Sequence, residues 1–215
     1  INSGEGGFLV TDDEDIAALA VLHSGSYMLY AQHRARPAMD VFDRHKFHAA
    51  NFSMRMSGLV AAILRPQLAQ LDARGQRWRE IHQCLVPLLS DIAHIHVPAR
   101  SPKEQFVPSS LQFSLIDLDS TQIRAFLRAA DEHGMHIKWF GNEEPLGFTS
   151  THAHWRYLRA DSSARSLVPG ADKVLRGLCD FRLPMWLSAA DCATIATVLR
   201  QAMDEALGEN LGAGI

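Results

Sequence analysis

Hydrophobic side chains recur at helical spacing along one stretch of the chain, from residue 51 to residue 89. The steps between them are three, four or seven residues, and this spacing stacks side chains on one face of a helix. The positions are Leu64, Leu68, Leu71, Trp78, Ile81, Leu85 and Leu88. The pattern predicts either one long bent helix or two successive helices. A stripe of this length is typical of a segment that connects two bodies.

Polar residues and two helix breakers give this stretch its expected limits. Side-chain oxygens between residues 51 and 57 can accept hydrogen bonds from the free amides of a helix start, so the helix is predicted to begin there. Pro66 lacks an amide hydrogen and is expected to kink or break the helix near residue 64. Gly75 is expected to weaken the helix without ending it.

Ahead of this stretch, the pattern predicts a strand, a helix and a long loop. Residues 8–10 form a short apolar run with strand character. Thr11 with Glu14 matches a capping box, and the helix that follows is predicted to end at Gly25. Residues 26–50 show no periodicity. Long loops inside compact domains tend to be functional, so this segment is predicted to reach into a site.

After residue 91 the chain predicts a separate domain that starts with a strand and a helix. Apolar and polar residues alternate over 111–117, which indicates a half-buried strand. The next helix is predicted to begin at Asp119 or Ser120 and to stop at Gly134, a residue type that readily adopts the left-handed conformation of helix ends.

The C-terminal third predicts a further strand and two further helices. Residues 135–140 favour a strand, and residues 171–179 favour a short helix. Ser188 and Asp191 form a capping box for a last amphipathic helix that is expected to stop at Gly208. Strands and helices that alternate in this way predict a small α/β domain.

Composition narrows the class of protein without naming an activity. The chain has 215 residues and a formal net charge of -3, which argues against nucleic acid or an anionic membrane as the main partner. The three cysteines are far apart and have no zinc-site or redox spacing, so they are predicted to be buried thiols in a reducing compartment. No apolar run is long enough for a membrane span, and no signal peptide is recognisable, so the expected location is the cytoplasm.

Few residues suggest chemistry by their spacing alone. The pairs His94/His96 and His152/His154 lack a third ligand at a recognisable spacing, so a structural role is favoured over a metal site for both, and no metal is predicted. Arginines at 55 and 156 can bind a carboxylate or phosphate through paired hydrogen bonds, although most arginines are solvated. None of the lysines lies in an apolar surrounding that would favour amine chemistry: Lys46, Lys103, Lys138 and Lys173.

Several short motifs, taken in order, resemble one enzyme family. They are Ser3-Gly4-Glu5-Gly6-Gly7-Phe8-Leu9-Val10-Thr11-Asp12, Asn51-Phe52-Ser53-Met54-Arg55-Met56-Ser57, Ala61-Ala62-Ile63, Gln67-Leu68 and Leu183-Pro184. Their order and spacing resemble the DegT and StrS family of pyridoxal-phosphate-dependent aminotransferases across nearly the whole chain. Each motif alone is weak, and the combination is fairly specific.

The resemblance implies a fold and a division of the chain. The fold class is α/β: the end of the large domain of a fold-type-I pyridoxal-phosphate transferase, a long connecting helix and a small C-terminal α/β domain. On this division, residues 1–57 finish the large cofactor domain, 58–90 form the connecting helix and 91–215 form the small domain. The lysine that holds the cofactor as an imine in family members falls just ahead of Ile1, so no catalytic residue is expected within this sequence.

The resemblance also implies cofactor and substrate contacts. Family members are usually homodimers with shared active sites, and an asparagine before the long helix reaches the neighbouring subunit's cofactor phosphate. Asn51 is the matching candidate, but the commoner pattern has asparagine two residues before the arginine, where this chain has Ser53. Both are therefore predicted to contact pyridoxal phosphate. The residues expected to contact substrate are Tyr30, Arg55, His154 and Arg156.

The implied activity is transfer of an amino group from an amino-acid donor to a keto sugar of a sugar nucleotide, or to a similar keto compound. Two alternatives stay open. A related enzyme with histidine in place of the lysine would be a sugar dehydratase, and only the residue at the imine position separates these reactions. A catalytically silent protein of the same fold would keep only dimerisation or binding. Its signature would be a stable protein of this length that binds no pyridoxal phosphate.

Overall fold

The computed structural model describes residues 1–4, 7–34, 36–143 and 168–212, with only the backbone of 209–212. Within these ranges the chain forms two compact units, Ile1–Leu71 and Asp72–Ile215, which we call the first unit and the second unit. The division falls inside the stretch that was predicted to connect two domains. None of the described helices combines the length and the hydrophobicity that a membrane-spanning helix needs.

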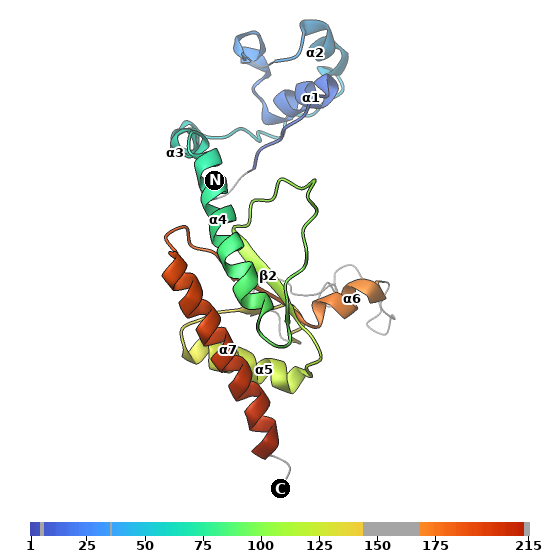
Figure 1. Cartoon of the computed structure of the whole chain (residues 1–215). Coiled ribbons are helices and arrows are strands. Elements are labelled where there is room, and N and C mark those ends of the chain that lie inside the picture. Colours follow the sequence, from blue (N-terminus) through green and yellow to red (C-terminus); the bar gives the residue numbers. More distant parts are fainter. Residues whose placement is uncertain (5–6, 35, 144–167, 213–215) are drawn as a thin grey trace. The chain divides into compact units, whose positions relative to one another are not determined.

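The first unit begins with helix α1, Glu14–Ser24 (Figure 1). Its N-cap is Asp13, whose carboxylate accepts hydrogen bonds from the amides of Asp15 and Ile16, so the predicted capping box of Thr11 and Glu14 is wrong. Thr11 instead accepts a hydrogen bond from the amide of Asp13 and supports the cap from outside the helix. The C-terminal end is as predicted, because Gly25 has a φ of 78° and its amide donates to carbonyls in the last turn.

The segment 26–50 is not the long loop that was predicted. It contains a short 3₁₀ helix, η1 (Tyr27–Gln32), and helix α2 (Met39–His45), which packs against α1. The sequence shows no period here because each helix is too short to present more than one or two buried positions. Tyr30 is the buried side chain of η1, and Val41 is that of α2.

Residues 8–10 do not form the predicted strand. The described part of the first unit contains no strand, and the side chains of Phe8, Leu9 and Val10 are 55%, 65% and 92% exposed. A strand requires a neighbouring strand to satisfy its backbone hydrogen bonds, and within the described part of the chain none lies beside this segment.

The predicted connecting stretch forms two successive helices, α3 (Gly58–Leu68) and α4 (Leu71–Ser90). Ser57 caps α3 by accepting a hydrogen bond from the amide of Val60, within the predicted range. The helix is not broken near residue 64, because Pro66 lies inside α3 and the helix ends two residues after it. A proline removes only one backbone donor, so the helix can continue past it with one hydrogen bond fewer. Gly75 lies within α4, as predicted.

The second unit contains an antiparallel sheet with strand order β1-β2-β4-β3. Its strands are Ile95–His96, Ser110–Leu115, Leu178–Arg182 and Lys138–Trp139, in that order. The alternating pattern predicted for residues 111–117 is confirmed in β2, whose buried side chains are Leu111, Phe113 and Leu115. Phe113 pairs with Cys179, and Trp139 pairs with the same cysteine from the other side, so one face of the sheet is apolar across three strands.

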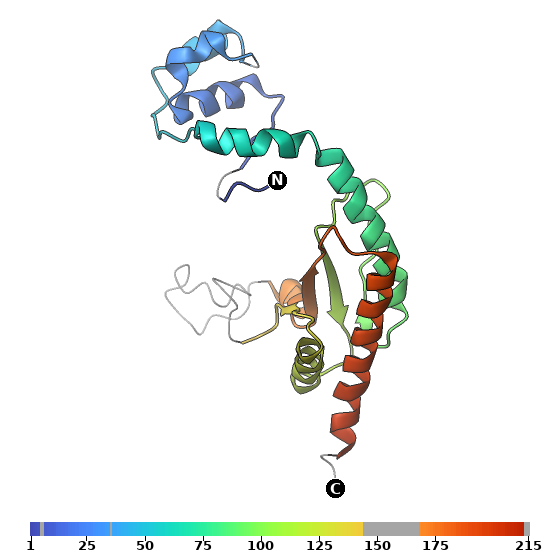
Figure 2. The same ribbon diagram turned by 90° about the vertical axis from the view of Figure 1, so that its left-hand side faces the viewer.

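Three helices cover this apolar face. α5 (Ser120–Glu132) is capped by Asp119, one of the two predicted residues, and Gln122 completes a capping box with it. α7 (Ala189–Gly212) has the predicted capping box of Ser188 and Asp191. Figure 2 shows α4 and α7 side by side on one side of β2 and β4. Their side chains share one core with the strands, which includes Ile81, Leu85, Leu89, Phe113, Phe126, Cys192, Leu199 and Met203.

Three predictions for this unit needed correction. The strand predicted for 135–140 is only the short β3. The helix predicted for 171–179 is α6 (Pro169–Leu175), and the residues after it begin β4, which pairs on both sides and was missed. The last helix continues past Gly208 to Gly212. A single glycine costs a helix only about 1 kcal/mol and does not by itself stop it.

Candidate functional site

The turn at residues 50–55 is attached to the C-terminal end of α1. The ring Nδ1 of His23 donates to the carbonyl oxygen of Ala50 at 2.7 Å, and the amide of Phe52 donates to the carbonyl of His23 at 2.9 Å. The rings of His23 and Phe52 also lie 5.2 Å apart. The turn that was predicted to bind cofactor is therefore placed by α1, a helix that lies more than twenty residues earlier in the chain.

Gly25 provides the surface on which this turn rests. A Cβ atom on Gly25 would lie 2.6 Å from Oδ1 of Asn51, which is too close for two non-bonded atoms. This position therefore requires glycine for two reasons: its positive φ and the close approach of the Asn51 side chain. The guanidinium of Arg55 donates from Nη1 to the carbonyl of Gly25 at 3.2 Å. Asn51 and Arg55 thus contact the same helix end from two positions in the turn.

Asn51 and Ser53 have different roles in the turn. Oδ1 of Asn51 accepts a hydrogen bond from the amide of Ser53 at 2.8 Å, which is an Asx turn. Ser53 has a φ of 52°, in the left-handed region that residues other than glycine and asparagine seldom adopt. Strained backbone of this kind occurs often at binding sites. Asn51 therefore holds the turn, and Ser53 is the residue that the turn displays to solvent.

The exposed donors of this turn suit a phosphate or a carboxylate. Within the described part of the chain, the hydroxyl of Ser53 has no hydrogen-bond partner, and Arg55 uses only Nη1. A hydroxyl and a guanidinium on one exposed turn can together bind an oxyanion through charge-assisted hydrogen bonds. The residues present thus fit the phosphate of a cofactor such as pyridoxal phosphate. Their contacts with cofactor and substrate stay predictions.

A cavity of about 500 Å³ adjoins the turn at Asn51. It is lined by residues of α1, η1, α2 and the segment after them: Leu22, Tyr27, Phe42, Lys46, Phe47, Ala49 and Asn51. Lys46 is the only cation among these, and its ammonium pairs with the carboxylate of Asp43 at 2.8 Å. Sequence reasoning did not single out Lys46 or Tyr27, because neither lies in a motif and only the packing of α1 and α2 brings them to one cavity.

Tyr30 is placed inside the first unit. Its side chain is 2% exposed, its hydroxyl donates to the carbonyl of Pro37 at 2.9 Å, and its ring lies 4.2 Å from that of Phe42. Burial raises the pKa of the Tyr30 hydroxyl above its ordinary value. These contacts give Tyr30 a structural role, and its contact with substrate stays a prediction. His154 and Arg156 lie outside the described residues.

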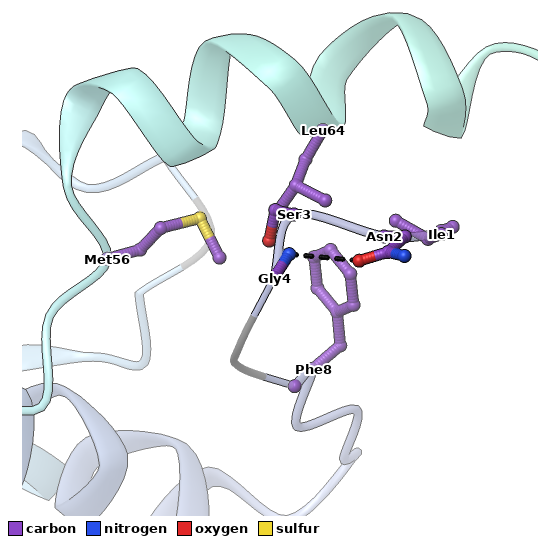
Figure 3. A pocket seen from close by; sticks show the side chains of 8 residues that line it. Ile1, Asn2, Ser3, Gly4, Phe8, Met56 and Leu64 are labelled. Atoms are coloured by element: carbon purple, nitrogen blue, oxygen red, sulfur yellow. Dashed lines mark hydrogen bonds between the residues drawn. The ribbon is translucent and has the colours of Figure 1, made fainter.

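A second, smaller cavity of about 110 Å³ lies beside the glycine-rich motif at residues 3–7, which we call the glycine turn, and Ser3, Gly4 and Gly7 of this motif line it. Figure 3 shows Leu64 pointing from α3 toward Ser3, with Met56 and Phe8 on either side of Gly4. Gly4 has a φ of 95°, a backbone conformation that favours glycine. Glu5 and Gly6 lie outside the described residues. Within the described ranges, no three histidine, cysteine or acidic side chains are grouped as metal ligands.

Comparison with known protein families decides which family this architecture represents. Residues 1–200 match the DegT/DnrJ/EryC1/StrS aminotransferase family. The chain belongs to this family. The match includes the glycine turn, the 50–55 turn and the Leu-Pro segment before α7, so the resemblance based on these motifs is confirmed. Among curated proteins, none matches closely enough to count as a relative.

Solved structures show the same fold. One is 3-amino-5-hydroxybenzoic acid (AHBA) synthase, with a TM-score of 0.56 and 17% identity. The match covers 84% of this chain and 46% of the synthase chain. Another is the aminotransferase TlmJ from Streptoalloteichus hindustanus, with a TM-score of 0.55 and 16% identity. The match covers 79% of this chain and 46% of the TlmJ chain. The chain thus spans about half the length of these structures. It has the fold of part of a pyridoxal-phosphate aminotransferase, in agreement with the predicted fold class.

Proposed function

We propose that this chain is the C-terminal portion of a pyridoxal-phosphate-dependent aminotransferase that transfers an amino group from an amino acid to a keto sugar or a similar keto compound. The observation that supports this most is the family match over residues 1–200, together with an exposed, strained turn at the position where the family is expected to bind cofactor phosphate. The two solved structures described above, named as a synthase of an amino-substituted acid and as an aminotransferase, fit the same class of reaction.

Ser53 and Arg55 are the residues that would hold the cofactor or the substrate. In this proposal the hydroxyl of Ser53 donates to a phosphate oxygen, and Arg55 presents its remaining N–H groups to phosphate or to a substrate carboxylate. Asn51 keeps the amide of Ser53 oriented, since its Oδ1 already accepts from that amide. When bound, pyridoxal phosphate supplies the electron sink that amino-group transfer needs.

The proposed protein is a homodimer with shared active sites. The first unit exposes many large apolar side chains, among them Phe47 at 84%, Met54 at 72% and Leu59 at 74%. Exposed apolar residues in such density are typical of surfaces that other protein covers. Phe52 and Met54 flank Ser53 in the 50–55 turn, so a surface that covers them also brings a neighbouring subunit to the candidate cofactor residues.

The test is the mass of the full-length protein after borohydride reduction in the presence of pyridoxal phosphate. Reduction converts a lysine–cofactor imine into a stable adduct. We expect one adduct per subunit, on a lysine that is none of Lys46, Lys103, Lys138 and Lys173. An unmodified mass would contradict the aminotransferase and favour a silent protein of the same fold. An adduct on one of the four named lysines would also contradict the proposal.

Two variants test the cofactor contacts. Ser53→Ala removes the proposed hydroxyl donor and is expected to weaken pyridoxal phosphate binding by about tenfold, as loss of one hydrogen bond to a charged group does. Ser57→Ala is the matched control, because Ser57 caps α3 and has no proposed contact with cofactor. Equal cofactor affinity of the Ser53 variant and the wild type would remove Ser53 from the site.

A further inference from the structure

The side chain of Gln67, in the last turn of α3, forms hydrogen bonds with both the backbone amide and the backbone carbonyl of Asn2. Its Oε1 accepts from the amide of Asn2 at 2.8 Å, and its Nε2 donates to the carbonyl of Asn2 at 2.7 Å. The same Nε2 also donates to the carbonyl of Ile63 at 3.1 Å. The side-chain amide thus pairs with Asn2 as a neighbouring peptide group would in a sheet.

Asn2 passes this constraint to the glycine turn. Its side-chain Oδ1 accepts from the amide of Gly4 at 2.9 Å, which is the dashed contact in Figure 3. Gly4 has a φ of 95°, a backbone conformation that residues other than glycine seldom adopt. Gln67, Asn2 and Gly4 therefore form one continuous set of hydrogen bonds that runs from α3 to the start of the turn.

We propose that Gln67 is a positioning residue that fixes the segment entering the glycine turn and, through it, the cofactor-binding lysine. The part that concerns the lysine rests on the proposed function, in which that lysine precedes the turn closely in sequence. A lysine on a chain segment fixed in one position reaches the cofactor at a lower entropic cost than a lysine on a mobile segment.

Only an amide side chain can make this set of contacts. The three hydrogen bonds need one acceptor and two N–H donors at the same position, and glutamine supplies both. Glutamate would keep the acceptor but place a carboxylate against the carbonyl oxygens of Asn2 and Ile63. Methionine has a similar length and can occupy the same half-buried position, but it makes none of the three hydrogen bonds.

The first measurement is amide hydrogen exchange in residues 1–4 of the full-length protein, without added cofactor. Gln67→Met is expected to raise exchange at Asn2 by about tenfold, because the amide of Asn2 loses its acceptor. Exchange at Gly4 is expected to rise by less, because Oδ1 of Asn2 remains as its acceptor but Gln67 no longer fixes Asn2. Gln70→Met is the matched control, because Gln70 is exposed and makes no side-chain hydrogen bond in the described part of the chain. Asn2→Ala is expected to release Gly4 alone. Exchange in Gln67→Met equal to that in Gln70→Met would overturn the proposal.

The second measurement separates positioning from a merely structural role. Affinity for pyridoxal phosphate, followed by cofactor absorbance, is expected to fall by about tenfold in Gln67→Met and in Gln67→Glu, with unfolding of the second unit unchanged. Unchanged affinity alongside faster exchange would limit Gln67 to local structure and overturn its role toward the lysine. If the wild type binds no cofactor, the proposed function fails, and the exchange experiment still decides whether Gln67 fixes the turn.

Discussion

Gly25 and Gly134 both end helices in the left-handed conformation, with φ values of 78° and 79°, but their surroundings differ. A Cβ on Gly134 would meet no atom within 4 Å, whereas a Cβ on Gly25 would lie 2.6 Å from the side-chain Oδ1 of Asn51. The two positions therefore separate the cost of backbone strain from the cost of a steric contact with the candidate site.

Gly134→Ala is expected to destabilise the second unit by about 1 kcal/mol through backbone strain alone. Gly25→Ala is expected to destabilise the first unit by about 2–3 kcal/mol, because it also displaces Asn51. Hydrogen exchange at increasing denaturant concentration measures the unfolding free energy of each unit and so measures both changes. In a protein that already carries Asn51→Ala, the further loss of stability caused by Gly25→Ala should equal the loss caused by Gly134→Ala. Strictly additive costs would show that Gly25 and Asn51 do not interact.

At Ser53, in contrast to the two glycines, one substitution is expected to increase stability. Asparagine adopts the left-handed conformation more readily than serine, and valine adopts it very rarely. Ser53→Asn is therefore expected to stabilise the first unit by about 0.5 kcal/mol, and Ser53→Val to destabilise it by about 1–2 kcal/mol. Shifts in the urea midpoint measure both changes. A loss of stability in Ser53→Asn would contradict the left-handed conformation of this residue.

Helices α1 and α2 are joined by one carboxylate. Oδ1 of Asp15 accepts from Nε2 of His45 at 2.7 Å and from Nη2 of Arg44 at 2.8 Å. These hydrogen bonds, that of His45 first, lower the pKa of Asp15 below its ordinary value of 3.8. Because the folded-state pKa is the lower one, the stabilisation is present above pH 3.8 and is lost as the pH falls through the folded-state value.

Asp15→Asn is therefore expected to lower the melting temperature of the first unit at neutral pH by a small amount, because the group is exposed and its ion pairs are screened. As the pH falls below the folded-state pKa of Asp15, the melting temperatures of the variant and the wild type should converge, since the carboxylate of the wild type becomes protonated. Asp12→Asn removes the same charge without an ion pair in the described residues and serves as the control. A difference that persists at low pH would assign the effect to helix packing instead.

The two units differ in how much core they contain. The second unit buries a continuous core built from α4, α5, α7 and the sheet. The buried hydrophobic residues of the first unit are few: Ala18, Leu22, Tyr30, Val41 and Leu64. A unit of this size that buries so little apolar surface does not offset the conformational entropy lost on folding.

A fragment of residues 72–215 is accordingly expected to unfold cooperatively in urea, and a fragment of residues 1–71 is expected to show no cooperative transition. Circular dichroism follows both transitions, and a dye that binds exposed apolar surface should bind the shorter fragment more strongly. A cooperative transition in residues 1–71 alone would contradict the expectation that this unit needs contact with other protein to fold.

Local patterns were sufficient wherever an element is specified by its own residues. The cap of α5 at Asp119, the capping box of α7, the stop at Gly25 and the alternation of β2 were predicted correctly, because their hydrogen bonds and faces involve residues at most a few positions apart. The glycine turn, the 50–55 turn and their order indicated the family. The resemblance indicated Asn51 and Ser53 as candidate cofactor residues, and this stays a prediction. It did not indicate that Asn51 holds the turn and that Ser53 is exposed on it.

Contacts between distant residues decided the rest. β4 forms because it pairs with β2 and β3, and residues 8–10 form no strand because no described strand lies beside them. The burial of Tyr30, the position of Lys46 at a cavity and the pairing of Gln67 with Asn2 also depend on residues far apart in the chain. Sequence periodicity carries no information on such pairings, because the free energy that selects them comes from surface buried between elements and appears only when the chain is folded.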